Sequence, residues 1–214
     1  MLSLVRYCEQ GAFGGAFQPV NTITNLAFIA AAVMLYLFFR TRKVHDWKAR
    51  LFVVLGLVLA ACSTLWHAYS TPFTFALDAA GIAAFFVVYV YLISLKAGGG
   101  RRFSIIVTAV YVIGLILTSL LFSTAPTSRF PSGAPDIIYT LLFIIALSLR
   151  VCRDNTKMYR AFAPPVLLAL SAFAFRQADL FSCSITGIGT HFMWHILVAA
   201  AYYYAVKALY ATFK

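Results

Sequence analysis

The feature that most constrains the fold is a series of long apolar runs separated by short polar breaks. A helix needs about 20 apolar residues to cross a bilayer. Seven runs of this kind cover residues 19–39, 51–67, 73–95, 103–122, 132–149, 161–177 and 188–210. The chain of 214 residues is 63% hydrophobic and only 11% charged, whereas soluble domains are about 45–50% apolar. The sequence therefore predicts an all-α polytopic membrane protein, with residues 1–214 forming a single seven-helix transmembrane bundle.

The lysines and arginines are distributed unevenly over the breaks between these runs. If the seven spans alternate in direction, 14 of the 17 basic residues fall on one side, and only Arg6, Arg129 and Arg176 fall on the other. Because cytoplasmic loops are enriched in Lys and Arg, we predict an outer N-terminus and a cytoplasmic C-terminus. The net charge of +11 is then explained by basic loops beside the membrane rather than by nucleic-acid binding. Residues 1–17 lack the apolar core of a cleavable signal peptide, and the short loops suggest a bacterial inner-membrane protein.

A few polar residues interrupt the apolar runs or lie at their ends. An ionisable group inside a span costs about 2.5–3.5 kcal/mol and usually marks a functional site. The candidates are Glu9, Ser63, His67, Asp78, Arg176, Asp179, His191 and His195. With the predicted orientation, all of them lie at one depth, near the outer leaflet. Unrelated structural residues would have no reason to share a depth, so we predict one site there.

The spacing of the histidines indicates metal binding. His191 and His195 are four residues apart, which places them on one helix face. Together with His67 from another helix they make a three-histidine site, and catalytic zinc favours three protein ligands with one open position. The soluble zinc-protease motif has a Glu directly after its first His. No residue between His191 and His195 can serve as a base, so Asp78 is the candidate carboxylate.

Structural interpretations compete with this prediction for individual residues. A lone intramembrane histidine is usually a hydrogen-bonded packing residue. Ser63 can bond its own helix backbone, although it also lies four residues before His67. Arg176 and Asp179 are at a spacing that permits a structural ion pair.

Six short segments together carry a family resemblance. They are YCEQ at 7–10, QPVNTITNLAF at 18–28, the Ser63–His67 pair, Asp78, FRQADLFSC at 175–183 and GTHFMWH at 189–195. In this order they resemble the alkaline ceramidase family, which belongs to a superfamily of seven-helix membrane hydrolases that includes the progestin/adiponectin receptors. The resemblance implies an intramembrane zinc held by His67, His191 and His195. Asp78 would orient or deprotonate a water molecule, and Ser63 would steady the substrate carbonyl or the developing oxyanion.

The resemblance also bears on calcium and on a disulfide. Eukaryotic ceramidases bind calcium near the N-terminus through acidic residues, of which Glu9 matches one. Arg6 stands where an Asp would align and Gln18 replaces a Glu, so these departures argue against a calcium site. Cys8 and Cys183 match family cysteines on the outer, oxidising side, which implies a disulfide between them. Cys62 and Cys152 are expected to be free.

The predicted function is zinc-dependent hydrolysis of a lipid amide, with ceramide cleaved to a sphingoid base and a fatty acid. A membrane lipid as the substrate accounts for a site that lies within the membrane boundary. Two alternatives stay open: a related hydrolase of lipid esters, similar to a phospholipase, and an adiponectin-receptor-like sensor in which the zinc is structural. Lipid profiling would distinguish the first alternative, and absence of turnover on amides and esters would favour the second.

Overall fold

The structure is a computed structural model of the 214-residue chain, and it describes residues 7–123, 134–153 and 156–211. Within these ranges the chain is almost entirely helical and contains no strand. The predicted all-α class is therefore confirmed. Arg6, Arg129 and the first two residues of the expected span 132–149 lie outside the described residues.

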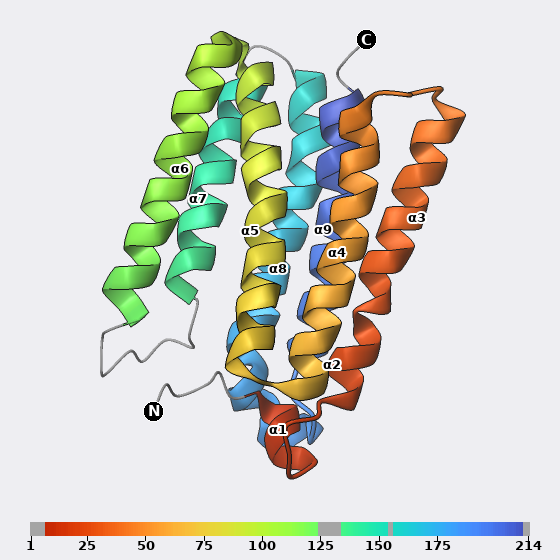
Figure 1. The fold of residues 1–214 in the computed structure, drawn as a ribbon, viewed down its shortest axis with the longest axis vertical. Coiled ribbons are helices and arrows are strands. Elements are labelled where there is room, and N and C mark those ends of the chain that lie inside the picture. The colour runs from red at the N-terminus through yellow and green to blue at the C-terminus, as the bar shows by residue number, and fades with distance from the viewer. Residues whose placement is uncertain (1–6, 124–133, 154–155, 212–214) are drawn as a thin grey trace.

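The long helices run up and down beside one another, and two short helices lie at one end of the bundle (Figure 1). The elements are α1 (Cys8–Ala12), α2 (Pro19–Thr24), α3 (Leu26–Thr41), α4 (Trp47–Tyr69), α5 (Pro72–Ser94), the π-helical turn η1 (Leu95–Gly99), α6 (Gly100–Ser123), α7 (Ala134–Cys152), α8 (Thr156–Thr186) and α9 (His191–Ala211). The short helices α1 and α2 lie where α4 ends and α9 begins (Figure 1).

The helices have the length and surface expected of membrane spans. Six helical stretches of the described chain are long and apolar enough to cross a membrane. The 23 residues of α4 correspond to about 34 Å of helix, compared with about 30 Å for the hydrocarbon core of a bilayer. Large apolar side chains also point outward, as on α6, where Ile106 and Leu121 are 62% and 69% exposed. A bundle of this kind is an integral membrane protein.

One of the six stretches, Pro72–Phe122, is 51 residues long and contains both α5 and α6. The chain reverses direction between these helices, at η1. Gly98 and Gly100 have φ angles of 83° and 67°, a backbone conformation that glycine adopts without steric cost. The helices α5 and α6 then pack side by side (Figure 1).

Two helices differ from their expected boundaries at the end where α1 lies. The helix α8 continues to Thr186, whereas its expected span ended at residue 177. The helix α9 begins at His191, three residues after the expected start at 188. The first difference arises because hydropathy detects only the apolar part of a helix, and the polar turns at the end of α8 lie outside that signal. The later start of α9 has another cause: Gly189 has a φ of 75°, and the amides of Thr190 and His191 donate to the Asp179 carboxylate instead of to a preceding helical turn.

The helix α9 lies inside the bundle and packs against α8, α3, α2 and α5. Its contact with α4 includes a hydrogen bond from the Tyr202 hydroxyl to the carbonyl of Phe52. Buried apolar side chains such as Leu35, Phe52 and Val206 form the main core around it. The same helix begins with two histidines that lie outside this apolar core, at the end covered by α1 and α2.

Candidate metal centre

Three buried histidines meet near the end of α4 and the start of α9. His67 lies in the last turn of α4, and His191 and His195 lie in the first two turns of α9. Each of the three is at most 2% exposed. The Nε2 atoms of His67 and His195 are 3.1 Å apart, and one ring nitrogen from each of the three histidines lies within 4.8 Å of the others. This group could hold a metal ion.

Gln18, the residue before α2, orients the ring of His67. Its side-chain Oε1 lies 2.8 Å from Nδ1 of His67 and also accepts a hydrogen bond from Nδ2 of Asn21 at 2.9 Å. The other end of the amide donates from Nε2 to the hydroxyl of Ser70. Because Oε1 can only accept, Nδ1 of His67 carries the proton and Nε2 presents a lone pair.

Thr24 performs the same role for His195. Its hydroxyl lies 2.9 Å from Nδ1 of His195 and directs its own proton to the backbone carbonyls of Val20 and Asn21. With the hydroxyl proton given to one of these carbonyls, the hydroxyl oxygen accepts from Nδ1 of His195, and the tautomer that fits this arrangement has its lone pair on Nε2. In protein zinc sites, the ring nitrogen of a ligating histidine that faces away from the metal donates in the same way to a protein oxygen.

These hydrogen bonds leave two nitrogen lone pairs facing each other at 3.1 Å. Two such nitrogens repel unless a cation lies between them. Tetrahedral zinc with Zn–N bonds of about 2.0–2.1 Å holds its ligand nitrogens about 3.3 Å apart, close to the observed separation. In the described part of the chain, Nδ1 of His191 is buried without a hydrogen-bond partner. The donor set and its hydrogen bonds therefore fit a metal ion.

Tyr7 covers the histidines on the side of α1. Its ring centroid lies 4.0 Å from that of His191 and 5.4 Å from that of His67. Burial raises the pKa of the Tyr7 hydroxyl, an effect that the nearby guanidinium of Arg176 opposes. At neutral pH the Tyr7 side chain is therefore an uncharged hydrogen-bond donor beside the three histidines.

Asp179 fixes the start of α9 and therefore the position of His191. Its Oδ1 accepts hydrogen bonds from the backbone amides of Thr190 and His191, both at 2.8 Å, and its Oδ2 accepts one from the amide of Cys8. A carboxylate at a helix N-terminus satisfies amides that have no partner within the helix. Gly189 makes this approach possible, because a Cβ there would lie 2.2 Å from Oδ1 of Asp179.

Glu9 has the same role at the start of α2. Its two carboxylate oxygens accept hydrogen bonds from the backbone amides of Val20 and Asn21, and its side chain is fully buried. Both oxygens are thus used in holding the helix that carries Asn21 and Thr24. Glu9 thus supports the hydrogen-bonding partners of the histidines.

A disulfide joins the segment before α2 to α8. Cys8 and Cys183 are bonded, with their Cα atoms 5.5 Å apart, and Cys62 and Cys152 are free. The bond lies beside the contact between Asp179 and the backbone of Cys8. It therefore holds α1 against α8, next to the three histidines.

Ser63 and Asp78 are not among the three grouped ligands. Ser63 is buried one turn before His67 on α4, and Asp78 lies near the start of α5. One oxygen of Asp78, Oδ1, is buried and has no hydrogen-bond partner among the described residues. The carboxylate thus retains an acceptor that the protein itself does not use.

Arg176 adds a cation to the same end of the bundle. Its guanidinium lies 5.7 Å from the centroid of the Trp194 ring. The Asp179 oxygens accept hydrogen bonds from three backbone amides, and the ion pair of Arg176 with Asp179 stays a prediction.

The residues that orient the histidines were not singled out in the sequence analysis. Gln18, Asn21 and Asn25 are all at most 1% exposed, and Thr24 lies among them. Their spacing follows the helical repeat, so they form one polar face at the start of an apolar run. A polar face of this kind within a predicted span is the signal that would have identified them.

Comparisons with known proteins add no family to this description: no family model matches the sequence, and no curated protein matches it. The fold and the site by themselves define a class. The chain is an all-helical integral membrane protein with a buried three-histidine group, at one end of its bundle, that could bind a metal ion.

Proposed function

We propose that the protein is a zinc-dependent membrane hydrolase that cleaves lipid amides, with ceramide as the expected substrate. The observation that carries this proposal is the protonation pattern of two histidines. Gln18 and Thr24 accept from the Nδ1 atoms of His67 and His195, so the two Nε2 atoms, at a separation of 3.1 Å, face each other without a proton. In a purely structural pair of histidines, a hydrogen bond between the two Nε2 atoms would be favourable. That bond cannot form when neither Nε2 carries a proton. The resemblance to alkaline ceramidases agrees with the same residues.

The proposal includes seven crossings with an outer N-terminus. The six apolar stretches include one of 51 residues that contains both α5 and α6, and counting these two separately gives seven. The excess of Lys and Arg at the end of the bundle where α3 and α4 are joined supports a cytoplasmic position for that end. The histidines then lie near the outer leaflet, in the inner membrane of a bacterium.

A zinc ion bound by His67, His191 and His195 would supply a Lewis acid and a water molecule with a pKa of about 7. Asp78 accepts a proton from the attacking water, and its unpartnered Oδ1 provides the acceptor. The hydroxyl of Ser63 donates a hydrogen bond to the carbonyl oxygen of the amide. Asp78 then returns the proton to the leaving nitrogen as the C–N bond breaks, which yields a fatty acid and an amine.

The direct test replaces Asp78 with Asn, which keeps the shape of the side chain and removes its basicity. Ceramide hydrolysis should fall by about 10²–10⁴-fold, while zinc stays bound because the three histidines are unchanged. Asp136→Asn is the matched control, since Asp136 lies in the first turn of α7, another long helix, and is not part of the histidine group. Full activity of the Asp78→Asn variant would refute the role of this carboxylate.

Assays on the same purified protein distinguish the two alternatives, a lipid ester hydrolase and a sensor with structural zinc. Hydrolysis of phospholipid esters without hydrolysis of ceramide would assign the site to an ester hydrolase. Bound zinc with no turnover of either lipid class would assign it to a sensor in which the metal is structural.

A further inference from the structure

Trp66 carries a buried hydrogen-bond donor that the described part of the protein does not use. It is the residue before His67 in α4, and its side chain is fully buried. Its indole nitrogen, Nε1, has no hydrogen-bond partner among the described residues. An indole N–H can only donate, and a donor that is buried without an acceptor is costly. Trp66 therefore indicates a ligand that supplies an acceptor.

Two sets of contacts place Trp66 beside the histidines and Tyr7. The side chains of Tyr7 and Trp66 pack against each other in a buried cluster of their own. The ring centroids of Trp66 and His67 are 6.2 Å apart, and those of Tyr7 and His191 are 4.0 Å apart. Tyr7 is thus adjacent both to the indole and to the candidate metal ligands.

The start of α5 borders the same region. The rings of Trp66 and Phe75 make an edge-to-face contact, with 5.1 Å between their centroids. Asp78 follows Phe75 by three residues, on the same face of α5. Burial raises the pKa of the Tyr7 hydroxyl, the Arg176 guanidinium lowers it, and the Asp78 carboxylate raises it further. This electrostatic effect agrees with Asp78 and Tyr7 facing one region.

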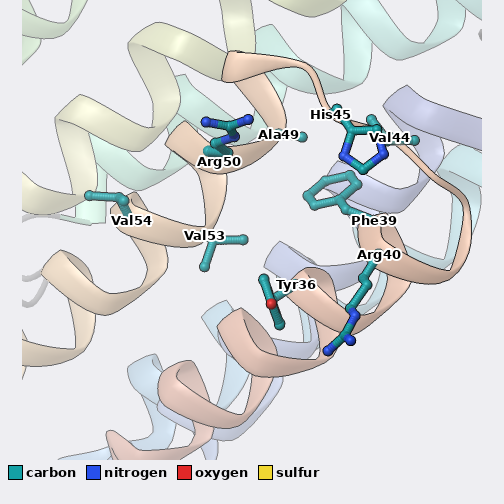
Figure 2. A pocket seen from close by; sticks show the side chains of 9 residues that line it. All are labelled: Tyr36, Phe39, Arg40, Val44, His45, Ala49, Arg50, Val53 and Val54. Carbon is teal, nitrogen blue, oxygen red and sulfur yellow. The ribbon is translucent and has the colours of Figure 1, made fainter.

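The hollow at the end of the bundle opposite α1 has a different character. It lies between the last turns of α3 and the first turns of α4. Its two arginines, Arg40 and Arg50, are exposed and point apart, with apolar side chains between them (Figure 2). The cationic groups of this hollow do not meet at one point, whereas the polar groups around Trp66 adjoin the histidines.

The chemistry of the ligand follows from the proposed hydrolysis of a lipid amide, on which this inference rests. In that reaction Ser63 donates to the amide carbonyl and Asp78 returns a proton to the amide nitrogen, so the acceptor for Trp66 is another oxygen of the lipid. In ceramide the remaining oxygens are the hydroxyl groups of the sphingoid base. A hydroxyl oxygen accepts from the indole N–H, and its proton is directed to the hydroxyl oxygen of Tyr7.

We propose that Trp66 and Tyr7 bind a hydroxyl group on the amine part of the lipid, so that the substrates of this hydrolase are N-acyl amino alcohols. Trp66 supplies the donor, and Tyr7 supplies the acceptor. A site built to hydrogen-bond a substrate hydroxyl discriminates strongly against an analogue that lacks it, because the buried polar groups are then left unpaired. Lipid amides without a hydroxyl group near the nitrogen are therefore poor substrates.

The kinetic test compares ceramide with its dideoxy analogue, in which hydrogen replaces both hydroxyl groups. The wild-type protein should hydrolyse ceramide with a kcat/KM at least about a hundredfold higher. Trp66→Phe keeps an aromatic ring beside Phe75 and removes the N–H, so it should lower the ratio of the two kcat/KM values by about fivefold to tenfold. Trp47→Phe, at the exposed start of the same helix, is the matched control and should keep this ratio within about twofold.

A second measurement reports on binding without hydrolysis. The indole Raman band that responds to hydrogen bonding of Nε1 is isolated as the difference between the spectra of the wild-type protein and the Trp66→Phe variant. Both proteins carry Asp78→Asn in this measurement, so that the lipid is not consumed. Ceramide should shift the band in the direction of a stronger hydrogen bond, and the dideoxy analogue should leave it in place.

Equal hydrolysis of the two amides by the wild-type protein would overturn the proposal, and this comparison depends on no variant. An equal loss of activity on both amides in Trp66→Phe would assign Trp66 a structural role and overturn it as well. A Raman band that neither lipid shifts, or that both shift equally, would have the same consequence. If the wild type hydrolyses neither amide, the proposed hydrolase function fails, and the Raman band alone decides whether the hydroxyl group is bound.

Discussion

Replacement of Gln18 by Leu tests whether the segment before α2 determines the state of the histidines. Leucine is similar in size to glutamine and has no acceptor for Nδ1 of His67, which lies 2.8 Å from Oε1 of Gln18. The proton on Nδ1 is then buried without a partner, at a cost of about 1–3 kcal/mol. The ring can avoid this cost by moving its proton to Nε2, and that change removes the lone pair that faces His195.

The expected effect is a weaker metal site. Loss of a hydrogen-bond partner behind a metal-ligating histidine lowers metal affinity by about 10–100-fold, equivalent to about 1.4–2.7 kcal/mol. The measurement is a zinc competition titration against a chelator of known affinity, performed on purified protein in detergent. The number of zinc ions bound at saturation should stay the same, because the three ligands are still present.

Gln10→Leu is the matched control for this prediction. Gln10 donates a hydrogen bond from Nε2 to the same Ser70 hydroxyl that Gln18 uses, at the same distance of 3.1 Å. It accepts a hydrogen bond from the amide of Tyr7. Zinc affinity should therefore change little in this variant. Wild-type affinity in the Gln18→Leu protein, or an equal loss in the Gln10→Leu protein, would refute the argument from the tautomer.

Three further predictions concern the residues around the histidines. Thr24→Val removes the acceptor for Nδ1 of His195 and should lower zinc affinity about tenfold or more in the same titration, whereas an unchanged affinity would contradict the role of the hydroxyl. Gly189→Ala places a methyl group within 2.2 Å of the Asp179 carboxylate, at a φ of +75°. It should lower the free energy of unfolding by about 1–3 kcal/mol and the thermal midpoint of unfolding by several degrees. A midpoint equal to that of the wild type would show that the hydrogen bonds between Asp179 and the start of α9 are not required. Cys8→Ser should abolish the difference in mobility between reduced and non-reduced protein on a denaturing gel, while Cys62→Ser should keep it, and absence of any difference in the wild type would exclude the disulfide.

The apolar helices could be predicted from the sequence because a span is a local property. Each run contains enough apolar residues to cross a bilayer, and the described parts of the expected spans are helical, the first of them divided between α2 and α3. The ends were less accurate. Residues 178–186 belong to α8, but they include Asp179, Ser182 and Ser184, in turns that contact α1 and α9.

The histidines could be selected from the sequence because imidazoles are rare in apolar runs and the pair on α9 has helical spacing. The proximity of His191 and His195 to His67 depends on how α4 and α9 pack. The sequence indicated this proximity only because the three histidines were predicted to lie at one depth in the membrane. The roles of Glu9 and Asp179 were not predictable in this way. Each caps a helix that is distant in sequence, and nothing local in the sequence shows which backbone amides a carboxylate will reach.

We propose that the three histidines hold a zinc ion that serves the hydrolysis of a lipid amide. The most direct measurement is metal analysis of the purified protein combined with a ceramide hydrolysis assay, on the wild type and on a His195→Gln variant. We expect about one zinc ion per chain and release of fatty acid by the wild type, and we expect the variant to lose both. Active protein without zinc, or a variant that keeps both zinc and activity, would contradict it.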